Sequence, residues 1–199
     1  IQLLGSQNDM ATIRLLLKLI PIQKKNVGIV TTGNEVYYGR IQDTFTPVVK
    51  EKIEEFGSAV TMECLVGDEK EKIRDAILDM IEKGAQMVVC TGGMSVDPDD
   101  RTPGAIADTG ARVVTYGAPV LPGAMLMVAY YKKKDGSEIP VLGLPGCVMY
   151  AKRTIFDLVL PRLLADDPIT REEIAQLGVG GLCLNCPVCS FPNCGFGKA

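Results

Sequence analysis

The sequence predicts an α/β fold, in which a mostly parallel sheet is covered by helices on both faces and is followed by a short cysteine-rich tail. Two observations support this prediction. Short apolar runs rich in β-branched residues alternate with helical patterns between residues 26 and 166, which is typical of a parallel sheet. After residue 178 glycine, proline and cysteine dominate, and this segment holds too little apolar material for a core of its own.

The first half of the predicted domain contains three strands with helices between them. The run from Val27 to Thr31 is short, apolar and β-branched, so it predicts a buried strand. From Thr44 onward the apolar side chains follow helical spacing, and Gly57 supplies the stop. The same reasoning predicts a strand over residues 59–66, a helix over 68–84 and a strand over 86–91.

The second half continues the alternation but ends in a hairpin and a long helix. A helix is predicted near residues 103–108, because Pro103 is favoured in a first helical turn. Further strands fit residues 112–116, 125–131 and 140–144, with the charged residues 132–138 as a hairpin turn. A long helix is predicted over residues 149–164 and a short one within 170–178.

The composition limits the classes of function. The 199 residues are 47% hydrophobic and 23% charged, as in an ordinary globular protein. A net charge of -3 argues against nucleic acid as a partner, and no apolar run approaches the roughly 20 residues that span a membrane. Without histidine, Ser-His-Asp and Cys-His catalysis and histidine-ligated metals are excluded.

Three regions are predicted along the chain. Because the chain opens at Ile1, residues 1–25 are expected to belong to a truncated neighbouring region. Residues 26–166 are the main domain, and residues 167–199 are a short helix and the cysteine-rich tail. No signal-peptide pattern is found in the first 25 residues, so we expect a cytoplasmic protein.

Three glycine loops follow predicted strands, at residues 31–35, 91–95 and 143–146. Ligands of open α/β sheets bind beyond the carboxyl ends of the strands. Glycine lets backbone N–H groups approach an anion closely, and Ser or Thr hydroxyls add donors. One such loop is weak evidence, because a plain turn explains it equally well. Three loops at three strand ends favour an anion-binding crevice.

Two acidic residues near these loops allow two interpretations. Asp100 would cap the helix that begins near Pro103, and Asp68 with Glu71 has a capping-box-like spacing. Alternatively, both carboxylates lie beside a phosphate-binding loop and hold Mg²⁺ against phosphate oxygens. Spacing alone leaves both interpretations open.

The motifs together carry a resemblance to a known family. They are Thr32-Gly33-Asn34-Glu35 with Gly39 and Asp43, then Thr91-Gly92-Gly93-x-Ser95 with Asp100-x-Thr102-Pro103, and finally Gly143-Leu144-Pro145-Gly146. In this order they resemble the molybdopterin-binding domain family of molybdenum cofactor biosynthesis, over about residues 27–164. The first and last motifs are most similar to those of the molybdopterin molybdotransferase branch.

The resemblance implies a three-layer α/β/α domain that inserts molybdate into adenylated molybdopterin and releases AMP with the help of Mg²⁺. Asp68 and Asp100 would be the catalytic carboxylates that position Mg²⁺ and molybdate. Residues matching the binding motifs are Thr32, Gly33, Asn34, Glu35, Gly92, Gly93, Ser95, Thr102, Pro145 and Gly146. Expected partners are a pterin or nucleotide substrate, a second copy of the chain, and a molybdoenzyme or another cofactor-synthesis protein.

Two departures from the family pattern keep other functions open. The family loop usually reads Thr-Gly-Asp-Glu, and here Asn34 replaces the aspartate. The usual Gly-Leu-Pro-Gly-Asn-Pro element continues here with Cys147, which is either a soft ligand for molybdenum or a small buried residue. The alternatives are adenylation of molybdopterin, and a carrier that binds the finished cofactor without catalysis.

The tail carries four cysteines in the pattern Cys183-x2-Cys186-x2-Cys189-x4-Cys194. Four thiolates at such spacing predict a metal site, either tetrahedral zinc or an iron–sulfur cluster. The alternative is a pair of disulfides or free thiols. Cys64 and Cys90 lie inside strand-like runs and are expected in the core.

Overall fold

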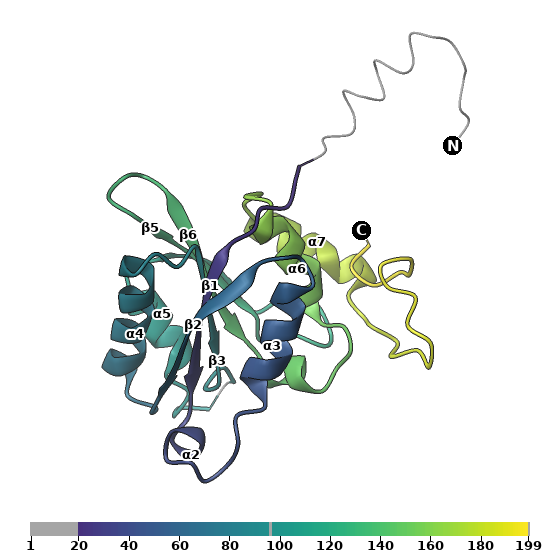
Figure 1. Cartoon of the computed structure of the whole chain (residues 1–199). Coiled ribbons are helices and arrows are strands. Elements are labelled where there is room, and N and C mark those ends of the chain that lie inside the picture. Colours follow the sequence, from purple (N-terminus) through teal and green to yellow (C-terminus); the bar gives the residue numbers. More distant parts are fainter. Residues whose placement is uncertain (1–19, 96, 199) are drawn as a thin grey trace, which may run out of the picture.

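Six strands form one sheet in the computed structural model, which describes residues 20–95 and 97–198 (Figure 1). Their order across the sheet is β2-β1-β3-β6-β5-β4. Strand β1 pairs in parallel with β2 and β3, and β3 with β6, whereas β5 is antiparallel to both of its neighbours. The strands are β1 Asn26–Thr32, β2 Ala59–Val66, β3 Met87–Thr91, β4 Arg112–Tyr116, β5 Met127–Lys132 and β6 Glu138–Leu144. The predicted mostly parallel sheet is confirmed.

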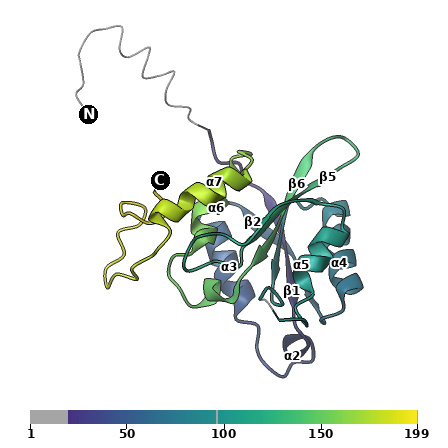
Figure 2. The ribbon, with the colours of Figure 1, turned by 180° about the vertical axis from the view of Figure 1, so that it is seen from behind.

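Helices cover both faces of this sheet, as the sequence predicts. Helices α3 and α6 lie on one face and α4 and α5 on the other (Figures 1 and 2). The α-helices are α2 Asn34–Tyr37, α3 Phe45–Glu54, α4 Lys70–Glu82, α5 Thr102–Asp108, α6 Ile155–Leu164 and α7 Arg171–Gln176. Two short 3₁₀ helices are η1 Gly146–Met149 and η2 Leu177–Gly180. No helix of the described segments has the length and apolar character needed to cross a membrane.

The central strands are apolar throughout because both of their faces are buried. In β1, Val27 and Ile29 face the core under α3 and α6, whereas Val30 faces the core under α4. Burying each such side chain stabilises the fold by roughly 1.5–3 kcal/mol. Gly28 sits where α4 passes closest, since a Cβ there would lie 2.6 Å from the Met80 sulfur. Helix α4 can therefore pack this closely on β1 because residue 28 has no side chain.

The long helix predicted over residues 149–164 is wrong at its start. Helix α6 begins only at Ile155, after η1 and an irregular segment. A capping box sets this boundary: the Thr154 hydroxyl accepts a hydrogen bond from the Phe156 N–H at 3.2 Å, and Asp157 accepts one from the Thr154 N–H at 2.8 Å. These paired bonds satisfy N–H groups that the first helical turn leaves free.

Asp157 also joins α6 to α3. Its carboxylate, 4% exposed, accepts hydrogen bonds from Lys52 Nζ at 2.7 Å and from Arg153 Nη1 at 2.9 Å. Lys52 belongs to α3 and is itself only 11% exposed. One buried carboxylate therefore binds two cations and accepts hydrogen bonds from both the N–H and the hydroxyl of Thr154.

The segment after α6 packs against the same core instead of forming a separate one. Ile169, Ile174 and Phe196 are buried in the cluster under α3 and α6. An isolated bridge pairs Leu182 with Leu121 in the loop between β4 and β5. The predicted region 1–25 lies largely outside the described residues.

Candidate functional site

A pocket of about 410 Å³ opens at the carboxyl end of the sheet, beside the loop that leaves β1. From β1 the chain crosses toward β2, whereas from β3 it leaves toward β4, so neighbouring strands send their connections in opposite directions. Such a switch point is where open α/β sheets bind ligands. The pocket is lined by Thr31, Thr32, Gly33, Asn34, Glu35, Val36, Ile41, Gln42, Asp43, Thr44, Phe45, Asp68, Met149 and Tyr150.

Two buried threonines clamp the loop after β3 onto β1. The Thr102 hydroxyl donates to the Gly92 carbonyl at 2.8 Å and lies 3.1 Å from the Thr32 hydroxyl. A hydroxyl has one proton, so Thr32 must be the donor to Thr102 in this chain of bonds. Their hydroxyl protons hold the two loops together, and the assignment of both residues to cofactor binding stays a prediction.

The glycines of this clamp are required by backbone geometry. Gly92 and Gly93 have φ angles of 84° and 53°, which L side chains rarely adopt. A Cβ at Gly92 would overlap the Thr32 carbonyl oxygen, and one at Gly93 would lie 3.0 Å from the Thr102 hydroxyl. The loop after β3 therefore presses directly against the end of β1.

Substituting Gly92→Ala should destabilise the fold more than the same change at Gly136. Gly136, in the turn between β5 and β6, has a φ of 88° but open space where a Cβ would lie. Both variants carry the backbone strain, about 1–2 kcal/mol, and only Gly92→Ala adds an overlap worth about 1–3 kcal/mol. Urea unfolding measures both. Equal losses of unfolding free energy would show that the loop does not press on β1.

Asp68 and Asn34 form a reciprocal pair between the loops after β2 and β1. The Asn34 N–H donates to Asp68 Oδ2 at 3.0 Å, and the Asp68 N–H donates to Asn34 Oδ1 at 3.3 Å. The capping interpretation of Asp68 is wrong, since Glu69 is the N-cap of α4 and no side chain caps it. The carboxylate is thus held at the pocket.

Asp100 carries a buried oxygen for which the described residues provide no partner. Its Oδ2 is out of contact with solvent and makes no hydrogen bond. The capping interpretation fails here too, because Arg101 is the N-cap of α5 and no side chain bonds to that end. An unsatisfied buried polar atom costs roughly 1–3 kcal/mol, and more when charged. Asp100 therefore keeps one carboxylate oxygen that the described residues leave without a hydrogen bond.

Tyr116 lies next to Asp100 and closes the loop after β3 from the side. Its hydroxyl donates to the Ser95 carbonyl at 2.8 Å. Burial, with the charge of Asp100, raises the pKa of Tyr116 above its ordinary value. The tyrosine therefore stays protonated at neutral pH and remains a donor to the loop. Ser95 itself is exposed at this edge.

Of the predicted site residues, those after β1 and β2 line the pocket: Thr32, Gly33, Asn34, Glu35 and Asp68. Those after β3 and at the start of α5 are not among its lining residues: Gly92, Gly93, Ser95, Asp100 and Thr102. Pro145 lines a neighbouring pocket with Cys147 and Cys183. Gly146 stays close to the first pocket, since a Cβ there would lie 3.8 Å from the ring of Phe45, a lining residue. The loop after β6 thus borders the site.

Asp43 is a pocket residue that the site prediction leaves out. Its Oδ1 accepts hydrogen bonds from the N–H groups of Phe45 at 2.8 Å and Thr46 at 3.1 Å, so it closes the first turn of α3. Thr46 in turn lies 2.9 Å from the hydroxyl of Thr31. An aspartate just before a helical pattern is the sequence signal for such a cap.

Burial tests the expectation that Cys64 and Cys90 lie in the core. Cys90 in β3 is fully buried, whereas Cys64 is half-buried, because β2 is an edge strand. Burial raises the pKa of the half-buried Cys147 thiol above its ordinary value. Half-burial is compatible with both interpretations of Cys147, as a small packed residue and as a ligand for molybdenum.

Comparison with known families identifies the family of the domain. Residues 28–165 match the family described as "Probable molybdopterin binding domain", and this match spans most of the chain. The chain belongs to this molybdopterin-binding family. The three glycine loops, Asp68 and Asp100 all fall within the matched residues.

Curated relatives of the molybdopterin-binding domain are longer proteins. The chain is 30% identical over 113 residues to the "Putative competence-damage inducible protein" of Bacillus cereus strain AH187, and equally so to that of Bacillus anthracis. The aligned part is 57% of this chain and 26% of each relative, so the chain spans about a quarter of their length.

Solved structures share the fold of this molybdopterin-binding domain. The tungsten cofactor synthesizing protein MoaB from Pyrococcus furiosus superposes with a TM-score of 0.58 at 18% identity, over 72% of this chain and 97% of that one. The protein CinA from Thermoplasma acidophilum gives 0.56 at 17% identity, over 70% and 98%. At this identity the likeness concerns the fold alone.

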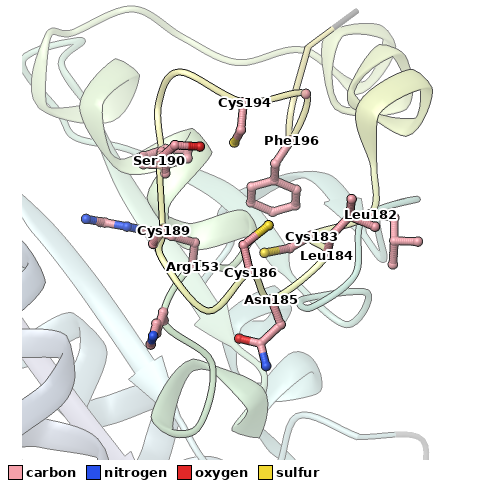
Figure 3. A pocket seen from close by; sticks show the side chains of 13 residues that line it. Arg153, Leu182, Cys183, Leu184, Asn185, Cys186, Cys189, Ser190, Cys194 and Phe196 are labelled. Atoms are coloured by element: carbon pink, nitrogen blue, oxygen red, sulfur yellow. The ribbon is translucent and has the colours of Figure 1, made fainter.

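The four tail cysteines follow the residues matched to the family and line one pocket with Lys152 and Arg153, which precede α6 (Figure 3). Throughout residues 20–95 and 97–198, no three Cys, Asp or Glu side chains are arranged to hold a metal ion. The metal assignment of Cys183, Cys186, Cys189 and Cys194 therefore stays a prediction, as does the Mg²⁺ assignment of Asp68 and Asp100.

Proposed function

We propose that this domain binds adenylated molybdopterin at the carboxyl ends of β1 and β3, inserts molybdate and releases AMP. The observation that carries the proposal is the buried, unpartnered Oδ2 of Asp100 beside the glycine loop after β3. Membership of the molybdopterin-binding family supports the pterin as substrate. The N–H groups of Gly92 and Gly93 would donate to phosphate oxygens of the substrate.

The donor set of the site fits Mg²⁺. This ion prefers oxygen ligands and commonly takes one or two carboxylates, with the remaining positions filled by water and substrate phosphates. Asp100 offers its free Oδ2, and Asp68 is held at the pocket through the loop of Asn34. When bound, Mg²⁺ would neutralise phosphate charge and ease the departure of AMP.

The chain's own residues would position the substrate. Thr32 and Thr102 hold the phosphate-binding loop against β1, so its glycine N–H groups are fixed before binding. Tyr116 holds the carbonyl of Ser95 and keeps that loop from folding away. Asp68 orients the backbone of Asn34 at the pocket wall.

A molybdate-dependence assay tests this proposal. Purified protein is incubated under anaerobic conditions with adenylated molybdopterin and Mg²⁺, with and without molybdate, and AMP is quantified. We expect AMP release only when molybdate is present. Consumption of ATP with free molybdopterin would instead identify an adenylyltransferase, and binding of the pterin without release of AMP would identify a carrier. Either result would overturn molybdate insertion.

The second candidate, cofactor carriage, is favoured by one observation. Asn34 stands where the family pattern has an acidic residue, and its side-chain oxygen is used to accept the Asp68 N–H. The pocket wall thus has one negative charge fewer than the family pattern. A carrier needs fewer groups to hold a metal against a leaving phosphate than a transferase does.

A further inference from the structure

The cysteine-rich tail contains nucleophilic side chains that the proposed function does not use. Cys183, Cys186, Cys189 and Cys194 line a single pocket together with Phe191 and Phe196 (Figure 3). The other cysteines are distributed over β2, β3 and η1. Four of seven thiols therefore gather at one place on the surface.

This tail has few contacts of its own to stabilise it. Apart from the bridge at Leu182, residues 181–198 form no helix or strand. Leu184 and Val188 are 77% and 85% exposed. One large side chain, Phe196, is fully within the core. Ordering a segment of this length needs more than one buried side chain, so a cross-link or a metal is expected to complete it.

Two of the four thiols are anchored to the folded domain. The Cys183 N–H donates to the Leu121 carbonyl at 2.8 Å, and both Cys183 and Cys194 pack against the core under α6. Cys186 and Cys189 lie on the exposed side of the pocket. Figure 3 shows Cys183, Cys186 and Cys194 among the side chains that line this one pocket.

Positive charge borders the thiols. Lys152 and Arg153 line the pocket, and the Arg153 guanidinium stacks on Phe191 at 4.9 Å from the ring centre. Four thiolates around a divalent cation leave a net charge of about −2. The Lys152 ammonium at the rim would compensate part of that charge, whereas the Arg153 guanidinium is already paired with Asp157. Phe191 and Phe196, with ring centres 6.4 Å apart, shield the inner side.

We propose that Cys183, Cys186, Cys189 and Cys194 bind one Zn²⁺ as a tetrathiolate site. In the described part of the chain no three thiols are yet arranged around one point, so binding draws the exposed Cys186 and Cys189 toward the anchored pair. Zinc has no geometric preference from d-electrons and tolerates the four-residue spacing before Cys194. The ferredoxin run has three residues there, with a proline after the last cysteine. This inference does not rest on the proposed function.

Metal content and cobalt spectroscopy test the site. Protein purified without chelators should contain about one zinc per chain. Cys186→Ser and Cys189→Ser each should lower that content at least about tenfold, because a lost thiolate leaves an incomplete tetrahedral shell. Cys64→Ser, on β2 and outside the tail, is the matched control and should retain zinc. Reconstitution with Co²⁺ should give thiolate-to-cobalt absorption in the parent chain and in Cys64→Ser only.

Three results would overturn the assignment. Intact mass under non-reducing conditions would reveal tail disulfides. Iron with acid-labile sulfide in place of zinc would identify a cluster. Zinc content unchanged in the double variant Cys186→Ser/Cys189→Ser would place any zinc elsewhere. Because Cys186 and Cys189 are exposed, circular dichroism should verify that the variants keep the fold.

Discussion

The Asp100→Asn variant should lose molybdate-dependent AMP release by about 10²–10³-fold while it still binds molybdopterin. The amide keeps the shape of the side chain but removes the charge that would hold Mg²⁺ through the buried Oδ2. Rates at saturating substrate measure the loss, and titration with molybdopterin measures the retained affinity. Asp99→Asn is the matched control, since Asp99 is an exposed neighbour, and it should keep full activity.

The same substitution should also change the stability of the fold, and there its expected effect is favourable. A buried carboxylate oxygen without a partner destabilises the folded chain, so Asp100→Asn should unfold at an equal or higher urea concentration than the parent. A variant that lost both activity and stability would indicate a structural role for Asp100. Activity within a few-fold of the parent would remove the carboxylate from the reaction.

Asp157→Ala should lower the free energy of unfolding by about 3–5 kcal/mol, the typical cost of removing one partner from a buried ion pair. The change leaves Lys52, which is 11% exposed, without its carboxylate and removes half of the capping box at Thr154. Urea unfolding measures the loss. Asp135→Ala is the control, because Asp135 is exposed in the turn between β5 and β6 and should cost under about 1 kcal/mol.

A double variant separates the effect of charge on stability from the effect of packing around Asp157. Lys52→Met combined with Asp157→Ala removes the more deeply buried of the two cations together with the carboxylate and leaves Arg153, so part of the loss should be recovered relative to Asp157→Ala. If the loss of unfolding free energy in the double variant equals the sum of the losses in Lys52→Met and Asp157→Ala, the two side chains do not stabilise each other.

The parts of the fold that depend on local preference could be predicted from the sequence. The apolar run of β1 and the left-handed backbone that Gly92 and Gly93 supply both follow from the residues themselves. The start of α6 is missed when only the apolar pattern is followed, although the capping-box spacing of Thr154 and Asp157 marks it in the sequence. Hydrophobic spacing marks a helix better than it marks its first residue.

The partners of the site's polar groups were beyond sequence reasoning because they are distant in the chain. Asp68 bonds to a residue 34 positions away, and Thr32 to one 70 positions away. Local spacing instead suggested that Asp68 and Asp100 cap helices, and neither does. The tail shows the same division, since the cysteine spacing is visible in the sequence but its docking beside Leu121 is not.

Phe196 has a consequence for the order in which the core can close during synthesis. It is 4% exposed in a cluster whose other buried members lie between Val27 and Ile174. A ribosome adding about 5–20 residues per second would need roughly 1–4 s to extend the chain from Ile174 to Phe196. Until Phe196 is added and docks, this cluster lacks one of its buried aromatic side chains, and contacts with a chaperone would be most useful then.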